Sequence, residues 1–281
     1  MNAGEDLLGA MAHSSRERAG RALGARNLAD WRRMARARPG PPSFRLSPLG
    51  FDLLCEIKFA SPAAGALRTA SPAAAAERAR TYERAGATAI SVLTEPERFG
   101  GDMSHLEAAA EAVDVPVMRK DFLVDPVQIF EARAAGAGGV LIIVRMLADQ
   151  ELDALLAATR EVGLFALLEA FDGNDLERAS AALEREKEAA PPRLVGVNSR
   201  NLVTLEVELE RLFDLAGKLP SGVPAVAESG LEGPDDARAL ARQGYSLALV
   251  GTILMRADDP LAEAQALLEA GRLGRKEAAC L

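Results

Sequence analysis

Two lysines in this chain follow runs of apolar residues, where a side chain could exchange protons with a bound molecule. Lys58 comes directly after residues 53–57, and Lys120 comes two residues after the stretch 115–118. The chain has only five lysines among its 33 basic residues, so arginine supplies most of its positive charge. Lysine differs from arginine because it can lose a proton when its pKa is lowered. The placement of these two lysines therefore favours proton transfer over simple ion pairing.

Carboxylates and other polar groups occupy similar positions elsewhere in the chain. Glu56 lies two residues before Lys58, so both side chains leave the same face of an extended segment. Other apolar runs end in further polar residues, namely Glu169, Asn198, Arg200, Glu228 and Ser229. A single charged residue after a strand often means only that the chain has reached solvent. Several together are better explained by pairing with one another and with a ligand, because burying unpaired charges is costly.

The apolar runs predict strands that are buried on both faces. They are continuous, whereas a strand with one wet face alternates apolar and polar residues. Eight such runs are present, at residues 53–57, 89–93, 115–118, 139–144, 164–168, 194–197, 224–227 and 247–250. Stretches rich in Ala, Glu and Arg predict eight helices between and after them, at residues 72–85, 104–113, 126–135, 149–161, 174–187, 208–218, 234–243 and 260–270.

Strict alternation of strands and helices leaves two common folds, an open doubly wound sheet and a closed barrel. Eight is the strand number of the barrel, and no G-x-G-x-x-G motif follows the first strand, which weakens the nucleotide-binding sheet. We therefore predict an α/β protein with a single (β/α)₈ TIM barrel over residues 47–272. One or two amphipathic helices should form an N-terminal extension over 1–46, and residues 273–281 should form a short tail. In such a barrel the carboxyl ends of the strands meet at one rim, where chemistry takes place.

Glycines after the last two strands predict a phosphate site. Gly230 follows the seventh strand, and Gly251 and Thr252 follow the eighth. Loops at these two places bind phosphate in many barrels through backbone N–H groups and a helix N-terminus. One such glycine is more often a turn requirement, but the combination favours a phosphorylated small molecule as the ligand.

Composition argues against several other classes of protein. The formal net charge of −8 disfavours a nucleic-acid binder. No run of about 18 apolar residues is present, so we expect no membrane span. Cys55 lies in an apolar run and Cys280 lies next to the C-terminus, so a structural disulfide is not expected, which fits a reducing cytoplasmic location. Neither His13 nor His105 lies at a strand end, so catalysis should depend on lysine and carboxylate without a metal.

Several motifs resemble those of the indole-3-glycerol-phosphate synthase family. Residues 55–62 read Cys-Glu-Ile-Lys-Phe-Ala-Ser-Pro, which is similar to the E-x-K-x-x-S-P motif on the first strand of that family. Further similar stretches follow in the same order across residues 50–260, at 91–95, 99–101, 119–122, 125–128, 168–169, 198–202, 228–230 and 254–256. So many ordered matches are more specific than a shared fold.

The resemblance implies a carboxy-lyase of tryptophan synthesis that uses no cofactor. The substrate would be 1-(2-carboxyphenylamino)-1-deoxyribulose 5-phosphate, which loses carbon dioxide and water as it closes to indole-3-glycerol phosphate. By matching position, Lys120 would be the general acid that protonates the substrate carbonyl. Glu169 would accept a proton, with Glu56 and Asn198 in support, and Lys58 would hold the carboxylate or phosphate side of the substrate.

The same resemblance implies the remaining contacts with the substrate. Glu228 and Ser229 would orient its hydroxyl groups, and Phe99 and Phe122 would pack on its aromatic ring. Other residues would bind phosphate or line the pocket, namely Ser61, Gly230, Gly251, Thr252, Arg200 and Leu202. Neighbouring cations are expected to lower the pKa of a catalytic lysine toward the working range. The protein is expected to be a monomer or a weak homodimer.

The sequence departs from the family pattern at a few places. Ala63 and Ala64 stand where the family often has serine and a basic residue, and Thr252 stands where serine is common. The N-terminal extension is unusually rich in arginine. Two alternatives remain open. A related sugar-phosphate isomerase would not need both Lys58 and Lys120, and a barrel that only binds ligands would be expected to lose an acid–base residue.

Overall fold

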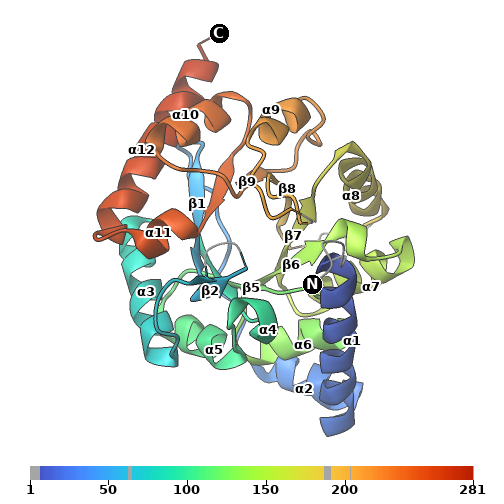
Figure 1. Cartoon of the computed structure of the whole chain (residues 1–281). Helices are drawn as coiled ribbons and strands as arrows, with labels where there is room; N and C mark the ends of the chain where they lie inside the picture. Colours follow the sequence, from blue (N-terminus) through green and yellow to red (C-terminus); the bar gives the residue numbers. More distant parts are fainter. Residues whose placement is uncertain (1–6, 63–64, 187–190, 203, 281) are drawn as a thin grey trace.

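Eight parallel strands form a closed barrel with helices around it (Figure 1). The structure is a computed structural model that describes residues 7–62, 65–186, 191–202 and 204–280. Neighbouring strands follow the order β1-β10-β9-β8-β7-β6-β5-β4. Their bounds are β1 (Asp52–Ile57), β4 (Ala89–Leu93), β5 (Val117–Lys120), β6 (Gly139–Ile143), β7 (Phe165–Ala170), β8 (Arg193–Asn198), β9 (Ala225–Glu228) and β10 (Leu247–Val250). The prediction of a (β/α)₈ barrel is confirmed.

A helix follows each barrel strand, as the sequence predicts. The eight are α3 (Pro72–Ala85), α5 (Met103–Ala112), α6 (Pro126–Ala134), α7 (Asp149–Glu161), α8 (Gly173–Arg185), α9 (Glu210–Ala216), α10 (Pro234–Arg242) and α12 (Pro260–Ala278). Local sequence fixes their ends. In α3, for example, the side chain of Ser71 accepts the N–H of Ala74, and Gly86 ends the helix at a φ of 95°. The last helix continues past residue 272, so residues 273–278 belong to α12.

Two helices precede the barrel and lie along one side of it (Figure 1). They are α1 (Leu7–Ala25) and α2 (Leu28–Ala37), and both contact α6. The face of α1 turned to the barrel is buried at Met11, Ser14 and Ser15. Met11 packs with apolar residues of the barrel interior, so α1 reaches the carboxyl ends of the strands. No helix in the described part of the chain is long and apolar enough to cross a membrane.

Side chains alternate along each strand between the barrel interior and the helix layer. On β1, Leu53 and Cys55 pack toward the helices, whereas Leu54 packs inside the barrel. The next side chains in the inner series are Glu56 and Lys58, toward the carboxyl end. The same two-residue step sets Lys120 above Met118, Glu169 above Leu167 and Glu228 above Val226. The barrel therefore has an apolar floor and a polar mouth.

Several short elements were not predicted from the sequence. They are α4 (Pro96–Phe99), α11 (Thr252–Arg256), the 3₁₀ helix η1 (Val144–Met146) and a hairpin of β2 (Ala60–Ser61) and β3 (Gly65–Ala66). The third barrel strand, β5, also starts at Val117 and not at residue 115. Pro116 has no N–H to donate to the sheet. The strand ends at Lys120, so this lysine is part of the barrel wall.

Candidate active site

A cavity of about 570 Å³ opens at the carboxyl ends of the barrel strands. It is the size of a small-molecule site. Fourteen of the fifteen residues expected from the sequence line it: Glu56, Lys58, Phe99, Lys120, Phe122, Glu169, Asn198, Arg200, Leu202, Glu228, Ser229, Gly230, Gly251 and Thr252. The barrel therefore brings together groups that lie up to 196 residues apart in the chain.

The ammonium group of Lys120 lies among carboxylates. Its Nζ donates to Glu169 Oε2 at 3.2 Å and lies 3.9 Å from Glu228 Oε2. Burial by itself lowers the pKa of Lys120, but nearby carboxylates outweigh burial and raise that pKa above its ordinary value. These carboxylates belong to Glu169, Glu228 and Glu56. The expectation that neighbouring cations lower the pKa of a catalytic lysine is therefore wrong for Lys120, which stays charged and able to donate a proton.

A second ion pair lies beside the first. Lys58 Nζ is 2.7 Å from Glu56 Oε1, as expected for two residues on the same face of β1. Burial raises the pKa of Glu56, but the positive charges of Lys58, Lys120 and Arg200 outweigh burial and lower that pKa overall. Glu56 is thus an ionised carboxylate shared between the two lysines, and it links them electrostatically.

Glu228 is the least satisfied carboxylate of the site. Only 1% of the residue is exposed, and among the described residues neither side-chain oxygen has a hydrogen-bond partner. Burial and the negative charge of Glu169 raise the pKa of Glu228 well above its usual value. Lys120 opposes this shift without cancelling it. A buried carboxyl group of this kind holds its proton to higher pH than a solvated glutamate.

Two glycines leave space for these carboxylates. A Cβ at Gly196, on β8, would collide with Glu228 Oε1, and a Cβ at Gly251 would collide with Glu56 Oε1. Each carboxylate therefore lies over the backbone of a neighbouring strand. Only glycine permits this close approach.

The loops after β9 and β10 close one end of the cavity. Ser229 and Gly230 both have positive φ angles, 67° and 85°, so the chain turns sharply after Glu228. Gly251 immediately precedes α11, whose first residue is Thr252. A short extra helix after the last strand is the usual setting for phosphate in barrel enzymes. Ser61 lies in the β2–β3 hairpin and is not among the described residues that line the cavity, and Ala63 and Ala64 fall outside the described residues.

An aromatic and apolar wall forms the opposite side of the cavity. The rings of Phe99 and Phe122 lie 6.1 Å apart at a tilt of 41°. Phe99 ends α4, which is held by Glu95, because that carboxylate accepts the N–H groups of residues 97, 98 and 99. Further apolar residues that were not expected from the sequence also line the cavity, including Leu141 and Ile143 on β6. The two-residue step along this strand was a signal that could have found them.

Asn198 and Arg200 form the edge of the cavity beside β8. The side chain of Asn198 accepts the N–H of Arg200 at 2.9 Å, and Arg200 Nη1 donates to the carbonyl oxygen of Leu205 at 2.8 Å. Burial lowers the pKa of Arg200, although Glu56 opposes that shift. These contacts give the strand end a fixed shape, with a guanidinium group close to the carboxylate of Glu56.

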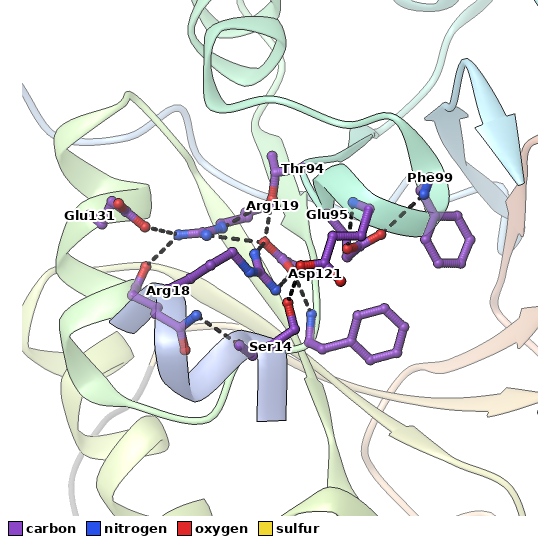
Figure 2. Close-up of polar contacts among 12 residues, drawn as sticks. Ser14, Arg18, Thr94, Glu95, Phe99, Arg119, Asp121 and Glu131 are labelled. Carbon is purple, nitrogen blue, oxygen red and sulfur yellow. Dashed lines mark hydrogen bonds and ion pairs between the residues drawn. The ribbon is translucent and has the colours of Figure 1, made fainter. Parts of the chain in front are cut away.

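Asp121 also lines the cavity, although no role for it was predicted. It is fully buried, and its carboxylate accepts hydrogen bonds from Arg18, Arg119 and Thr94 (Figure 2). Burial raises the pKa of Asp121, but the two arginines and the threonine outweigh burial and lower it to about 2. Among the described residues, no group of three or more His, Cys, Asp or Glu side chains is arranged to hold a metal ion.

Comparisons of this chain with known proteins show which family it is similar to. The family model described as Indole-3-glycerol phosphate synthase matches residues 29–267. The chain is 46% identical over 223 residues to the indole-3-glycerol phosphate synthase of Kineococcus radiotolerans, covering 79% of this chain and 77% of that protein. It is 44% identical over 239 residues to that of Methanopyrus kandleri, covering 84% and 90%. A solved 3-hexulose-6-phosphate synthase from Salmonella typhimurium aligns at a TM-score of 0.61 and 16% identity over 78% of this chain and 98% of that one, which concerns the fold alone.

Proposed function

Since the chain belongs to the indole-3-glycerol phosphate synthase family, we propose that its barrel mouth closes the indole ring of 1-(2-carboxyphenylamino)-1-deoxyribulose 5-phosphate. The reaction forms a carbon–carbon bond between the aromatic ring and the substrate carbonyl, releases carbon dioxide and then eliminates water. It needs proton transfer and stabilisation of charge. The observation that carries the proposal is the ammonium of Lys120, which lies 3.2 Å from Glu169 inside the cavity.

Lys120 is the general acid in this proposal. As the ring carbon attacks the carbonyl carbon, the carbonyl oxygen gains negative charge and takes a proton from Nζ. The raised pKa of Lys120 keeps the ammonium protonated in the free enzyme, so the proton to be delivered is present. A higher pKa also makes the ammonium a weaker acid, so it is the position of Lys120 in the cavity that supports the role. Loss of carbon dioxide returns the electron pair to the ring. The hydroxyl group then leaves as water after a second protonation.

Glu169 accepts the proton released as the indole double bond forms. Its contact with Lys120 supports this role, because the same pair can then return the proton to the lysine. Glu56 and Asn198 keep the lysines and the strand ends in place. Glu228 and Ser229 orient the substrate hydroxyl groups, and the oxygens of Glu228, which lack a hydrogen-bond partner among the described residues, are available for such contacts.

The two ends of the substrate fit different parts of the cavity. Phe99 and Phe122 pack on the aromatic ring, and Leu202 and Arg200 line the same space. Lys58 pairs with the substrate carboxylate or with its phosphate side. The backbone at Gly230, Gly251 and Thr252 binds the phosphate group, for which the start of α11 offers N–H donors. A hydroxyl contribution from Ser61 would require the β2–β3 hairpin to approach the substrate.

We also propose that the protein works in the cytoplasm as a monomer or weak homodimer. Both cysteines are free thiols, and the exposed one, Cys280, is compatible with a reducing compartment. Gel filtration at several protein concentrations would test the oligomeric state.

The direct test is incubation of the purified protein with the anilino-deoxyribulose phosphate. We expect the indole product, followed by its absorbance, and carbon dioxide to form in equimolar amounts. A protein that binds the substrate without forming either product would contradict the proposal, and so would a protein that isomerises the sugar phosphate while leaving the carboxyl group in place.

A further inference from the structure

The N-terminal helix α1 touches two of the loops that shape the cavity. Ser14 and Arg18 are four residues apart and so share one face of this helix. Ser14 Oγ donates to Glu97 Oε1 at 2.9 Å, and Arg18 makes two hydrogen bonds of 2.8 Å each to the oxygens of Asp121. One face of α1 thus contacts both the loop after β4 and the end of β5.

Each of these contacts is made to a residue that lies close in the chain to one of the two aromatic residues of the cavity, Phe99 or Phe122. Glu97 lies in α4, the four-residue helix that ends at Phe99. Asp121 precedes Phe122 and accepts the backbone N–H of Phe122 at 2.8 Å. Figure 2 shows this arrangement, with α1 below the carboxylate of Asp121 and the ring of Phe99 beyond Glu95. The helix α1 therefore contacts the segments that carry both aromatic residues.

The contact between Arg18 and Asp121 is buried and strongly directional. Only 14% of the Arg18 side chain is exposed, and the Asp121 side chain is fully buried. The two parallel hydrogen bonds fix both the position and the plane of the carboxylate. Arg119 and Thr94 hold the same carboxylate from the barrel side, at 3.0 and 2.8 Å. Arg18 thus completes a cluster whose other members lie on the barrel.

We propose that Arg18 and Ser14 are positioning residues for the aromatic end of the substrate. They act through Asp121 and Glu97 to keep the rings of Phe122 and Phe99 at the spacing that receives the anthranilate ring. The inference rests on the proposed function and deepens it, because it names residues outside the cavity that set its affinity for one part of the substrate.

The proposal separates binding from chemistry. Lys120 takes its ion pairs from β7 and β9, so loss of Arg18 leaves those pairs in place. In the proposed function the substrate phosphate binds at the loops after β9 and β10, which line the other side of the cavity. A defect in Arg18 should therefore weaken binding of the aromatic end, while kcat and the binding of phosphate change little.

The test compares Arg18→Met with Arg16→Met, since Arg16 is exposed on the same helix. In Arg18→Met we expect KM for the anilino-deoxyribulose phosphate to rise about tenfold, the effect of losing hydrogen bonds to a charged group. We expect kcat to fall by less than about threefold, and the inhibition constant of inorganic phosphate to stay at the wild-type value. Arg16→Met should match the wild type, and Arg18→Lys should recover part of the loss.

One further variant keeps the proposal testable if Arg18→Met folds poorly, and a double variant tests the coupling where it folds well. Ser14→Ala removes one hydroxyl group and should raise KM about two- to threefold with kcat unchanged. In the double variant Arg18→Met with Asp121→Asn, KM should rise less than the product of the two single effects, because both act through one contact.

Three results would overturn the inference. The first is a KM for Arg18→Met equal to that of Arg16→Met. The second is a parallel rise in KM and in the inhibition constant of phosphate, since this would indicate general loosening of the barrel. The third is a wild-type protein that forms no indole product, which would contradict the proposed function and this inference with it. An active wild type with an unaffected Arg18→Met would contradict this inference alone.

Discussion

Lys120 and Asp121 are adjacent in the chain, yet they belong to two ion clusters of opposite composition. Lys120 faces the barrel cavity, where one ammonium group lies among three carboxylates. Asp121 lies between the barrel and α1, where one carboxylate is held by the guanidinium groups of Arg119 on the barrel and Arg18 on α1. The pKa of Lys120 is raised by its neighbours, and that of Asp121 is lowered to about 2.

The two clusters also differ in how completely their polar atoms are paired. The carboxylate of Asp121 accepts hydrogen bonds from two arginines, a threonine and a backbone N–H. The carboxylate of Glu228, in the cluster around Lys120, has no hydrogen-bond partner among the described residues. A fully paired cluster holds the structure together, whereas an incompletely paired one leaves polar atoms for a substrate. The comparison predicts that Asp121→Asn mainly lowers stability and that Lys120→Arg mainly lowers the rate of ring closure.

The largest expected effect is that of Lys120→Arg. Arginine keeps the positive charge but does not release a proton at neutral pH, so ring closure should slow by about 10³- to 10⁴-fold. The melting temperature and the binding of a substrate analogue should change little. Rates are measured by indole absorbance, with the exposed Lys276→Arg as the control. Activity near that of the wild type would remove Lys120 as the proton donor.

Asp121→Asn should cause the largest loss of stability. Removing one partner of a buried ion pair should lower the free energy of unfolding by about 3 to 5 kcal/mol. Urea denaturation would measure this loss. Asp153→Asn, in an exposed pair with Arg185, is the matched control and should cost less than about 1 kcal/mol. Equal losses in the two variants would contradict the comparison.

The same variant has a defined pH dependence. The folded protein lowers the pKa of Asp121 from 3.8 to about 2, so the carboxylate stabilises the fold above the unfolded value. This stabilisation is lost as the pH falls through the range between these values. The difference between wild type and Asp121→Asn should therefore be constant from neutral pH down to about pH 5 and shrink below about pH 4.

Glu169→Gln should have an intermediate effect, a fall in kcat of about 10²-fold. The amide keeps the shape of the side chain but cannot accept the proton. The pH–rate profile should also change, and an unchanged profile would count against Glu169 as the proton acceptor. Glu184→Gln, at an exposed position of α8, is a suitable control.

Glu228→Gln should change stability by less than Asp121→Asn and in the opposite direction. The raised pKa of Glu228 means that folding opposes its ionisation, so the wild-type protein loses stability as the pH rises through the folded pKa. The neutral amide avoids this loss and should stabilise the protein by about 1 to 3 kcal/mol near neutral pH. This gain should disappear as the pH falls toward the pKa of glutamate in the unfolded chain. Ring closure should also be slower in the variant. A lower melting temperature at neutral pH would contradict this account of Glu228.

Most of the barrel and of its mouth could be predicted from the sequence. Continuous apolar runs specify buried parallel strands, and polar residues at their ends converge only in a closed barrel. Lys58 and Lys120 stand out because arginine is otherwise preferred. The family resemblance then supplied roles that the residue types left open.

Other features depend on contacts that a local pattern does not contain. Arg18 and Asp121 are 103 residues apart, and the arginine-rich extension gave no reason to select Arg18. The helix α4 has four residues, too few for a periodic signal, and it depends on hydrogen bonds from its backbone to Glu95. The pKa of Lys120 depends on which charges surround it in three dimensions, and these are the carboxylates of Glu169, Glu228 and Glu56, which raise it.

Gly196 and Gly251 have no Cβ, and this limits which substitutions the barrel mouth tolerates. An alanine at either position would carry no charge and no new function, yet it would push Glu228 or Glu56 out of place. Mutational routes to new chemistry on this scaffold are therefore restricted by steric exclusion at positions that never contact substrate through a side chain.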